Sequence, residues 1–400
     1  MSDSGVPEPP SVPGMTPTKI ATGVVAAATL VTPAASATAT ASAAPAAQST
    51  VQFTSGNPGY REKDMIDPLV VAHRGASGYR PEHTLAAYDL GVGMGADYIE
   101  PDLVMTKDGV LVDRHEPEIS ETTDVADRPE FADRKTTKKL DGKSVTGWFV
   151  DDFTLEELKT LRAKERLGDV RQESSTYDGR FEVPTFEEVL DRREALSRKT
   201  GRTIGIIPEI KHSTYLHQEG FDPEAEVARL VKKHHLNHRK APLWVQSFEL
   251  TALKDLRSEH GLKARTTFLT STSGGPYDLR EEGTTYAELT TADSMRELSR
   301  WIDGFGPTKD QVVARNADGT LGKPTSFVED AHDAGLTVMP YTLRAENQFL
   351  PTDYRIGTDP SDFGRAVDEA RVFLEAGVDG VFCDQPDVCV EARKDFLAED

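Results

Sequence analysis

Short apolar runs alternate with amphipathic stretches along the chain from about residue 69 onward. An apolar run of four to eight residues is typical of a buried strand, and apolar residues three or four apart are typical of a helix. Several helical stretches open with Ser, Thr or Asp and close with Gly, as helix caps do. The pattern predicts eight strands, at Leu69–His73, Tyr98–Asp102, Thr203–Ile210, Leu243–Phe248, Ala264–Leu269, Ile302–Phe305, Leu336–Tyr341 and Gly380–Asp384.

Alternation of strand and helix favours a parallel sheet, and eight such strands favour a closed (β/α)8 TIM barrel. An open, doubly wound sheet is the alternative. No glycine-rich dinucleotide fingerprint follows the first predicted strand, which counts against that alternative. We therefore predict a single α/β barrel domain over residues 51–400.

Residues 104–202 interrupt this alternation and are expected to form an insertion after the second strand. Asp108-Gly109 lies between two apolar-polar runs, a strong signal for a β-hairpin. If these two residues form the whole turn, Asp102 lies opposite His115. The polar stretch that follows, residues 124–145, is expected to be a loop, and two helices complete the insertion.

Residues 1–50 are expected to lie outside the domain. The segment after Lys19 is apolar and then rich in small residues, in the order of a secretory signal peptide, and it is too short for a membrane span. Cleavage is expected near Ala37 or Ala43, so the mature protein would be secreted, with no stable membrane insertion. A disordered Ala/Thr-rich tail is the alternative.

A formal net charge of −21 disfavours nucleic acid and anionic membranes as partners. An anionic substrate would therefore need a local positive site. The chain has two cysteines, Cys383 and Cys389, and an exported protein can hold a disulfide. The residues alone leave a disulfide and two buried thiols equally open.

Acidic residues stand at the ends of two consecutive predicted strands. In a barrel, the carboxyl ends of the strands face the active site. Glu100 and Asp102 are two apart on one strand and point to the same side, and Glu209 ends the next strand. Three carboxylates suit Ca²⁺ or Mg²⁺. The alternative is that these acids pair with Arg74 and Lys211.

Two histidines join this set: His73 ends the first strand, and the hairpin brings His115 back to the acids. Such a pair suits general acid–base chemistry, whereas a lone histidine is more often structural. Arg74 and Lys211 suit a phosphate oxyanion. Phe248 and Tyr341, at the fourth and seventh strands, are further candidates for substrate contact.

Six stretches of the chain resemble the glycerophosphodiester phosphodiesterase family, in the family's order and between Val71 and about Asp387. They are HRGASGYRPEHT, GADYIEPDLVMTKDGVLVDRHE, PEIKH, QSFE, MPYTLRAEN and GVDGVFCDQPD. The resemblance is closest to the exported bacterial periplasmic-type branch. It implies a (β/α)8 barrel with His73 and His115 as the acid–base pair. It also implies metal ligands Glu100, Asp102 and Glu209, phosphate contacts from Arg74 and Lys211, and Glu82 orienting the His-Arg pair.

The chain departs from the family pattern at three positions. His83 stands where the family usually has Asn, and it could alter the mouth of the site. Glu116 stands where Asp is usual, beside His115. Cys383 stands where a small hydroxyl residue is common, which favours the disulfide slightly. Neither of the first two changes removes a group that the chemistry needs.

The resemblance implies hydrolysis of a glycerophosphodiester to sn-glycerol 3-phosphate and an alcohol. One divalent cation is implied, with Ca²⁺ favoured and Mg²⁺ possible, and the substrate would resemble glycerophosphocholine or a teichoic acid. One alternative is a lipid-acting relative of the sphingomyelinase D or lysophospholipase D kind. A second is a secreted binding protein that has kept the barrel and lost catalysis.

Overall fold

The computed structural model describes residues 67–399. They form one compact unit. The predicted signal peptide, its cleavage sites and the domain boundary near residue 50 lie outside the described residues and stay predictions. No helix among residues 67–399 is long and apolar enough to cross a membrane.

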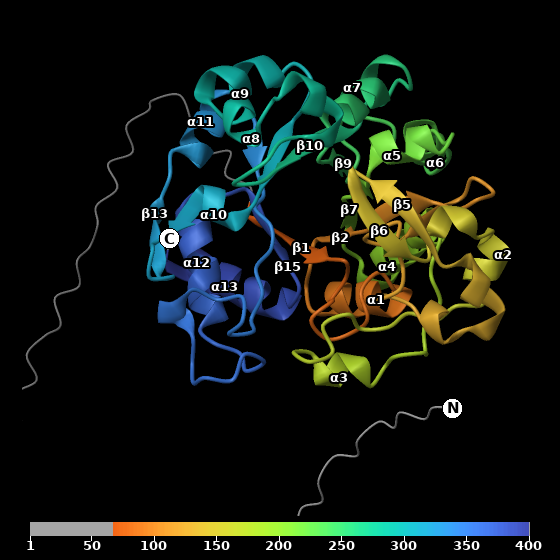
Figure 1. Cartoon of the computed structure of the whole chain (residues 1–400). Helices are drawn as coiled ribbons and strands as arrows, with labels where there is room; N and C mark the ends of the chain where they lie inside the picture. The colour runs from red at the N-terminus through yellow and green to blue at the C-terminus, as the bar shows by residue number, and fades with distance from the viewer. Residues whose placement is uncertain (1–66, 400) are drawn as a thin grey trace, which may run out of the picture. The chain divides into compact units, whose positions relative to one another are not determined.

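Parallel strands form a closed barrel (Figure 1). One sheet runs β15-β1-β2-β7. The second runs β14-β11-β10-β9-β8 and continues into β3 and β4, where β8 is Glu209–Ile210, β3 is Asp102–Met105 and β4 is Leu111–Asp113. Bridges at Ile206–Leu243 and Leu343–Cys383 join the two sheets and close the ring. The eight barrel strands are, in chain order, β1 (Leu69–His73), β2 (Tyr98–Glu100), β7 (Gly205–Ile206), β9 (Trp244–Ser247), β10 (Arg265–Thr270), β11 (Gly304–Pro307), β14 (Thr337–Val338) and β15 (Gly380–Cys383).

Proline interrupts the second and third barrel strands, each of which the sequence predicts as one continuous strand. Pro101 separates β2 from β3 (Asp102–Met105), and Pro208 separates β7 from β8 (Glu209–Ile210). Proline has no N–H to give to a sheet, so the ladder stops and resumes with a new neighbour. The resumed register pairs Asp102 with Glu209, and Glu209 with Gln246. These breaks therefore place two of the predicted site residues, Asp102 and Glu209, in adjacent positions.

Helices cover the outside of the barrel, and apolar side chains of strands and helices form one large core between the two layers. Thr84 and Thr185 cap two of these helices by accepting hydrogen bonds from backbone N–H groups. The longer helices are α1 (Leu85–Gly93), α4 (Phe186–Thr200), α6 (Pro223–Lys233), α7 (Leu250–Ser258), α9 (Ala292–Leu298), α11 (Phe327–Asp333), α12 (Ala366–Glu375) and α13 (Pro386–Glu399). Shorter ones are α2 (Leu155–Leu158), α3 (Gln172–Ser175), α5 (Ser213–Gln218), α8 (Tyr286–Leu289), α10 (Lys309–Val312), and the 3₁₀ turns η1 (Val125–Asp127), η2 (Pro129–Arg134), η3 (Val150–Asp152), η4 (Tyr277–Glu282) and η5 (Thr352–Tyr354).

The hairpin after the second barrel strand has a different register from the one that the sequence predicts. β3 pairs with β4 (Leu111–Asp113) so that Leu103 faces Asp113, and the Arg114 N–H donates to the Asp102 carbonyl. The turn has three residues, 107–109, and ends on Gly109 with φ +78°. A three-residue turn with glycine in the left-handed region shifts the register by one relative to a two-residue turn. The prediction that Asp102 lies opposite His115 is therefore wrong.

The insertion also contains a second hairpin, where the sequence predicted a loop. Strands β5 (Thr136–Leu140) and β6 (Lys143–Gly147) pair in antiparallel fashion around an Asp141-Gly142 turn. Most of their side chains are exposed and polar, so no buried alternation marks them in the sequence. A further small hairpin joins β12 (Val313–Arg315) to β13 (Leu321–Pro324).

Candidate active site

A cavity of about 320 Å³ opens among the residues at the carboxyl ends of the barrel strands. Eight of the ten site residues predicted from the sequence line it: His73, Arg74, Glu100, His115, Glu209, Lys211, Phe248 and Tyr341. The other two, Glu82 and Asp102, are buried and contact Arg74. The fold therefore brings all ten predicted residues to one place.

Glu100, Asp102 and Glu209 form a buried carboxylate cluster. Each offers an oxygen, and these oxygens lie within 4.8 Å of one another. Burial and the neighbouring Asp102 raise the pKa of Glu100 well above its usual range, and burial raises the pKa of Glu209 to about 8. Asp102 Oδ1 is buried without a hydrogen-bond partner. Mutually repelling acids with an unused oxygen fit a bound divalent cation.

Arg74 contacts both the carboxylate cluster and Glu82. Its backbone, in the left-handed region at φ +59°, turns the N–H toward Glu100 Oε2 at 2.8 Å. Its guanidinium donates to Glu82 at 3.0 Å, and Arg166 donates to the same Glu82 oxygen at 2.8 Å. Although burial opposes charge, Arg74 and Arg166 hold the pKa of Glu82 well below its usual range. Glu82 therefore orients Arg74.

The imidazole of His73 is oriented by a residue that sequence reasoning did not select. His73 Nδ1 lies 2.6 Å from Asp384 Oδ1, just after the last barrel strand. Arg171 and Arg344 donate to the other Asp384 oxygen at 2.6 and 2.7 Å. Both guanidiniums and His73 hold the pKa of Asp384 well below its usual range despite burial. Its place at a strand end, like that of Glu100, was the signal that could have found it.

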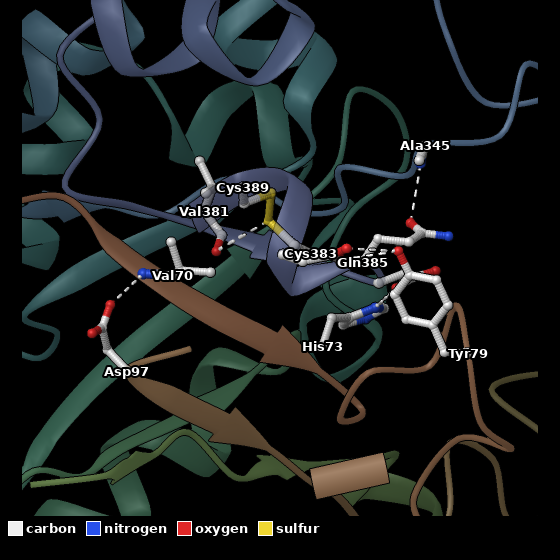
Figure 2. Close-up of a disulfide and its surroundings, with 11 residues drawn as sticks. Val70, His73, Tyr79, Asp97, Ala345, Val381, Cys383, Gln385 and Cys389 are labelled. Carbon is white, nitrogen blue, oxygen red and sulfur yellow. Dashed lines mark hydrogen bonds and ion pairs between the residues drawn. A yellow bond between two sulfur atoms is a disulfide. The ribbon is translucent and has the colours of Figure 1, made fainter. Parts of the chain in front are cut away.

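A disulfide joins Cys383, beside Asp384, to Cys389 in α13. Figure 2 shows this bond together with His73 and with the hydrogen bond from the Ala345 N–H to Gln385. The pairing that the sequence left open is therefore resolved in favour of the disulfide. It closes the short segment that carries Asp384.

His115 stands at the start of a chain of hydrogen-bonded groups that runs away from the cavity. Its Nδ1 lies 3.0 Å from Glu116 Oε1, and Glu116 Oε2 lies 2.8 Å from His212 Nε2. His212 Nδ1 lies 2.7 Å from Asp141, in the turn between β5 and β6. Hydrogen bonds to Asp141 and Glu116 outweigh burial and raise the pKa of His212 to about 9. Glu116 and Asp141 of the insertion, joined by His212, thus support His115.

Both cavity histidines have lowered pKa values. Burial, and then the neighbouring Arg74, lower the pKa of His73 to about 4. Burial, Arg74 and Lys211 lower the pKa of His115 to about 3. In each ring the Nδ1–H donates a hydrogen bond to a carboxylate, and with the lowered pKa the Nε2 is an unprotonated acceptor at neutral pH.

His83 is buried and does not line the cavity, so it does not alter the mouth of the site as the departure from the family pattern suggested. Its side chain is fully buried, and Nε2 donates to Asp102 at 2.8 Å while Nδ1 lies 3.2 Å from Asp113. The Asp113 and Asp102 carboxylates raise the pKa of His83 although burial lowers it. A strand-to-helix loop that folds inward, with His83 at φ +55°, explains this placement.

A polar cavity at the carboxyl ends of parallel barrel strands is the place of the active site in enzymes with this fold. Residues 73–388 match the model of the glycerophosphoryl diester phosphodiesterase family, and the chain belongs to that family. It is 36% identical over 334 residues to the glycerophosphodiester phosphodiesterase GDPD6 of Arabidopsis thaliana, covering 79% of this chain and 83% of that one. It is 30% identical to the Haemophilus influenzae glycerophosphodiester phosphodiesterase, over 82% of this chain and 90% of that one. The predicted enzyme class is confirmed.

Solved structures support the fold. A glycerophosphoryl diester phosphodiesterase candidate from Silicibacter pomeroyi matches with a TM-score of 0.57 at 21% identity, over 82% of this chain and 94% of that one. The Oleispira antarctica phosphodiesterase OLEI02445, solved with the product sn-glycerol-3-phosphate, matches with a TM-score of 0.51 at 22% identity, over 82% and 97%. The predicted (β/α)8 barrel is confirmed.

Proposed function

We propose that this protein hydrolyses glycerophosphodiesters to sn-glycerol 3-phosphate and an alcohol. The observation that carries the proposal is a cavity that two neutral imidazoles and two cations line, beside a cluster of three carboxylates of which Glu100 and Glu209 also line it. Named relatives at 30% and 36% identity support the reaction. The product bound to the Oleispira antarctica protein supports sn-glycerol 3-phosphate as one product.

Glu100, Asp102 and Glu209 would hold one divalent cation in this proposal. The ligand atoms that these three residues offer are carboxylate oxygens, and hard oxygen donors suit Ca²⁺, which we favour, or Mg²⁺. Such a cation, when bound, polarises a phosphoryl oxygen and lowers the pKa of a nearby hydroxyl or water. The buried, unpartnered Asp102 Oδ1 and the raised pKa of Glu209 both favour this assignment.

The proton transfers are assigned to His73 and His115. One unprotonated Nε2 accepts the proton of the attacking hydroxyl, and the other histidine gives a proton to the departing alcohol. An anionic phosphodiester beside Arg74 and Lys211 offsets the charges that lower both histidine pKa values, so one ring can carry that proton. Asp384 and Glu116 hold the two rings in place.

Arg74 and Lys211 would bind the phosphate oxygens, since both are buried cations that line the cavity. Phe248 and Tyr341 would form an apolar wall, with their rings edge to face at 5.8 Å. We further propose that the protein acts outside the cytoplasm after removal of its first residues, on glycerophosphocholine-like substrates or teichoic acid. Detection of a mature N-terminus near Ala37 or Ala43 in the culture medium would test that location.

The deciding experiment is release of glycerol 3-phosphate from glycerophosphocholine, after chelation and then with Ca²⁺ or Mg²⁺ added back. We expect chelation to abolish release and one metal to restore it, because the carboxylate cluster would otherwise stay unneutralised. The lipid-acting alternative predicts release of headgroup from lysophospholipid instead. Binding without product under any metal, from folded protein, would contradict the proposed reaction.

A further inference from the structure

A second cluster of potential metal ligands lies in the outer helical layer, away from the barrel mouth. His217 belongs to α5, and Asp222 and Glu224 lie at the start of α6. Each of the three offers one ligand atom, and these atoms all lie within 4.8 Å of one another. None of the three lines the active-site cavity, and none takes part in the reaction steps above.

The turn between α5 and α6 fixes this cluster. The chain reverses at Gly220, with φ +90°, and the Gly220 N–H donates to the His217 carbonyl at 3.0 Å. The side chain of Phe221 packs against the core of the barrel. Asp222 then caps α6 by accepting a hydrogen bond from the Ala225 N–H at 2.8 Å. The ligand groups are therefore held close together before any ion binds, which reduces the ordering cost of binding.

A second imidazole reaches the same cluster from a third helix. His260 follows α7, and its Nε2 lies 3.6 Å from Asp222 Oδ1. His217 Nε2 lies 2.9 Å from Glu224 Oε2. Two ligand atoms of a tetrahedral Zn²⁺ ion stand about 3.3 Å apart, since each bond is about 2.0–2.1 Å long. Both observed spacings are close to that value, so small side-chain movements would place all four groups around one ion.

Three helices thus meet at this cluster. α6 packs against α5 on one side and against α7 on the other, on the outside of the barrel (Figure 1). A hydrogen bond between His217 and Glu224 would by itself serve to link α5 to α6. It does not account for His260, whose Nε2 is too far from Asp222 for a hydrogen bond and yet at the spacing of two ligands of one metal ion.

Carboxylates are in excess around the two histidines. Asp255, in α7, adds a further acid to Asp222 and Glu224. Burial raises the pKa of Asp255, and repulsion from Glu224 raises it further, although both histidines lower it. A divalent cation bound among these groups would relieve that repulsion.

The donor atoms determine which cation fits. Imidazole nitrogens together with carboxylate oxygens suit Zn²⁺, whereas Ca²⁺ and Mg²⁺ prefer oxygen ligands alone. The carboxylate cluster at the barrel mouth offers oxygen atoms only, so the two clusters should select different metals.

We propose that His217, Asp222, Glu224 and His260 form a Zn²⁺ site that joins α5, α6 and α7 on the outside of the barrel. The site shares no residue with the active-site cavity, so the inference does not depend on the proposed function.

The test is equilibrium dialysis of the full chain against Zn²⁺ in the presence of excess Ca²⁺, at about pH 8, where protons compete little for imidazole. We expect the wild type to retain Zn²⁺. His217→Ala and His260→Ala should each weaken that binding at least tenfold, because loss of a mere supporting partner already costs about 10–100-fold in metal affinity. Zn²⁺ should also raise the thermal unfolding midpoint of the wild type and not that of His217→Ala, since an ion that binds only the folded state stabilises it.

Two further variants are the controls. His238→Ala removes an exposed histidine that belongs to neither cluster, and Glu209→Gln removes a carboxylate from the cluster at the barrel mouth. Both should keep the Zn²⁺ affinity of the wild type. Absence of Zn²⁺ binding by the wild type, or unchanged affinity in either ligand variant, would overturn the proposal. Loss of the binding in Glu209→Gln would place the ion at the barrel mouth and overturn it as well.

Discussion

His73 and His115 share one cavity, yet different parts of the chain hold them. The Nδ1 of His73 is fixed by Asp384, which two arginines hold as a charged acceptor. The Nδ1 of His115 is fixed by Glu116, which belongs to a second network that reaches the insertion. Each ring thus presents Nε2 in a defined direction without depending on the other, as separate proton-transfer roles require.

Replacement of His115 by Ala is expected to lower kcat about 10²–10⁴-fold, since a positioned acid–base group contributes about that much. The measurement is steady-state release of glycerol 3-phosphate at saturating metal. His238→Ala, at an exposed histidine after α6, is the control and should keep full activity. Unchanged turnover in His115→Ala would show that the assignment to His115 is wrong.

His212 should make stability depend on pH. Its pKa is about 9 in the folded protein, above the usual value of 6.5, because Asp141 and Glu116 favour the charged ring. A raised pKa means that the stabilisation is complete below about pH 6.5 and is lost as pH rises through about 9. We expect the difference in unfolding free energy between wild type and His212→Asn to shrink by about 1–3 kcal/mol from pH 6 to pH 10.

Denaturant unfolding of both proteins across that pH range measures this difference directly. Titration of lysines and tyrosines elsewhere affects both proteins alike and cancels in the comparison. A difference that stays constant from pH 6 to pH 10 would mean that His212 carries no extra charge in the folded state.

Two elements of the fold contribute to the site without carrying a predicted site residue. The β5–β6 hairpin supplies Asp141 to the network behind His115. The start of α13 supplies Cys389 to the disulfide that closes the Asp384 segment. An exposed hairpin and a covering helix thus determine how groups at the barrel mouth are held.

Removal of the disulfide by Cys383→Ser together with Cys389→Ser is expected to cost about 2 kcal/mol of stability, from the loop entropy of so short a closed segment. Activity should fall as well, because Asp384 follows Cys383 directly and orients His73. Denaturant unfolding and initial rates, each with and without a reducing agent, measure both effects. The double variant is the control, since reduction should change only the wild type. Wild-type stability that is insensitive to reduction would contradict the prediction.

At the scale of the whole molecule, a net charge of −21 opposes the approach of an anionic substrate. Arg74 and Lys211 attract that substrate only over a short range, because buried carboxylates pair with both. The long-range repulsion lies in solvent and is screened by salt, whereas the buried contacts are not.

We therefore expect kcat/KM for glycerophosphoglycerol, a net anion, to rise about two- to tenfold between about 10 mM and about 150 mM NaCl. Glycerophosphocholine is zwitterionic and should respond much less. Rates at low substrate concentration, measured for both substrates over the same salt series, provide the comparison. Equal salt dependence would show that the net charge does not govern substrate capture.

The sequence by itself determined the barrel and ten residues that meet at its mouth. Strand ends are marked locally, by apolar runs that stop at His73, at Glu100 and at Glu209. A closed parallel barrel brings the carboxyl ends of its strands together at one face. Recognising each strand end in the sequence was therefore enough to predict that these residues lie close together.

Only the tertiary structure decided the register and the supporting groups. The observed hairpin register differs by one residue from the predicted one, because the turn has three residues and not the two that Asp108-Gly109 favours. His115 nevertheless lines the cavity. Asp384, which holds His73, and His212, which holds Glu116 beside His115, come from segments far from those histidines in the chain. Such contacts depend on how separate elements pack, which no local pattern encodes.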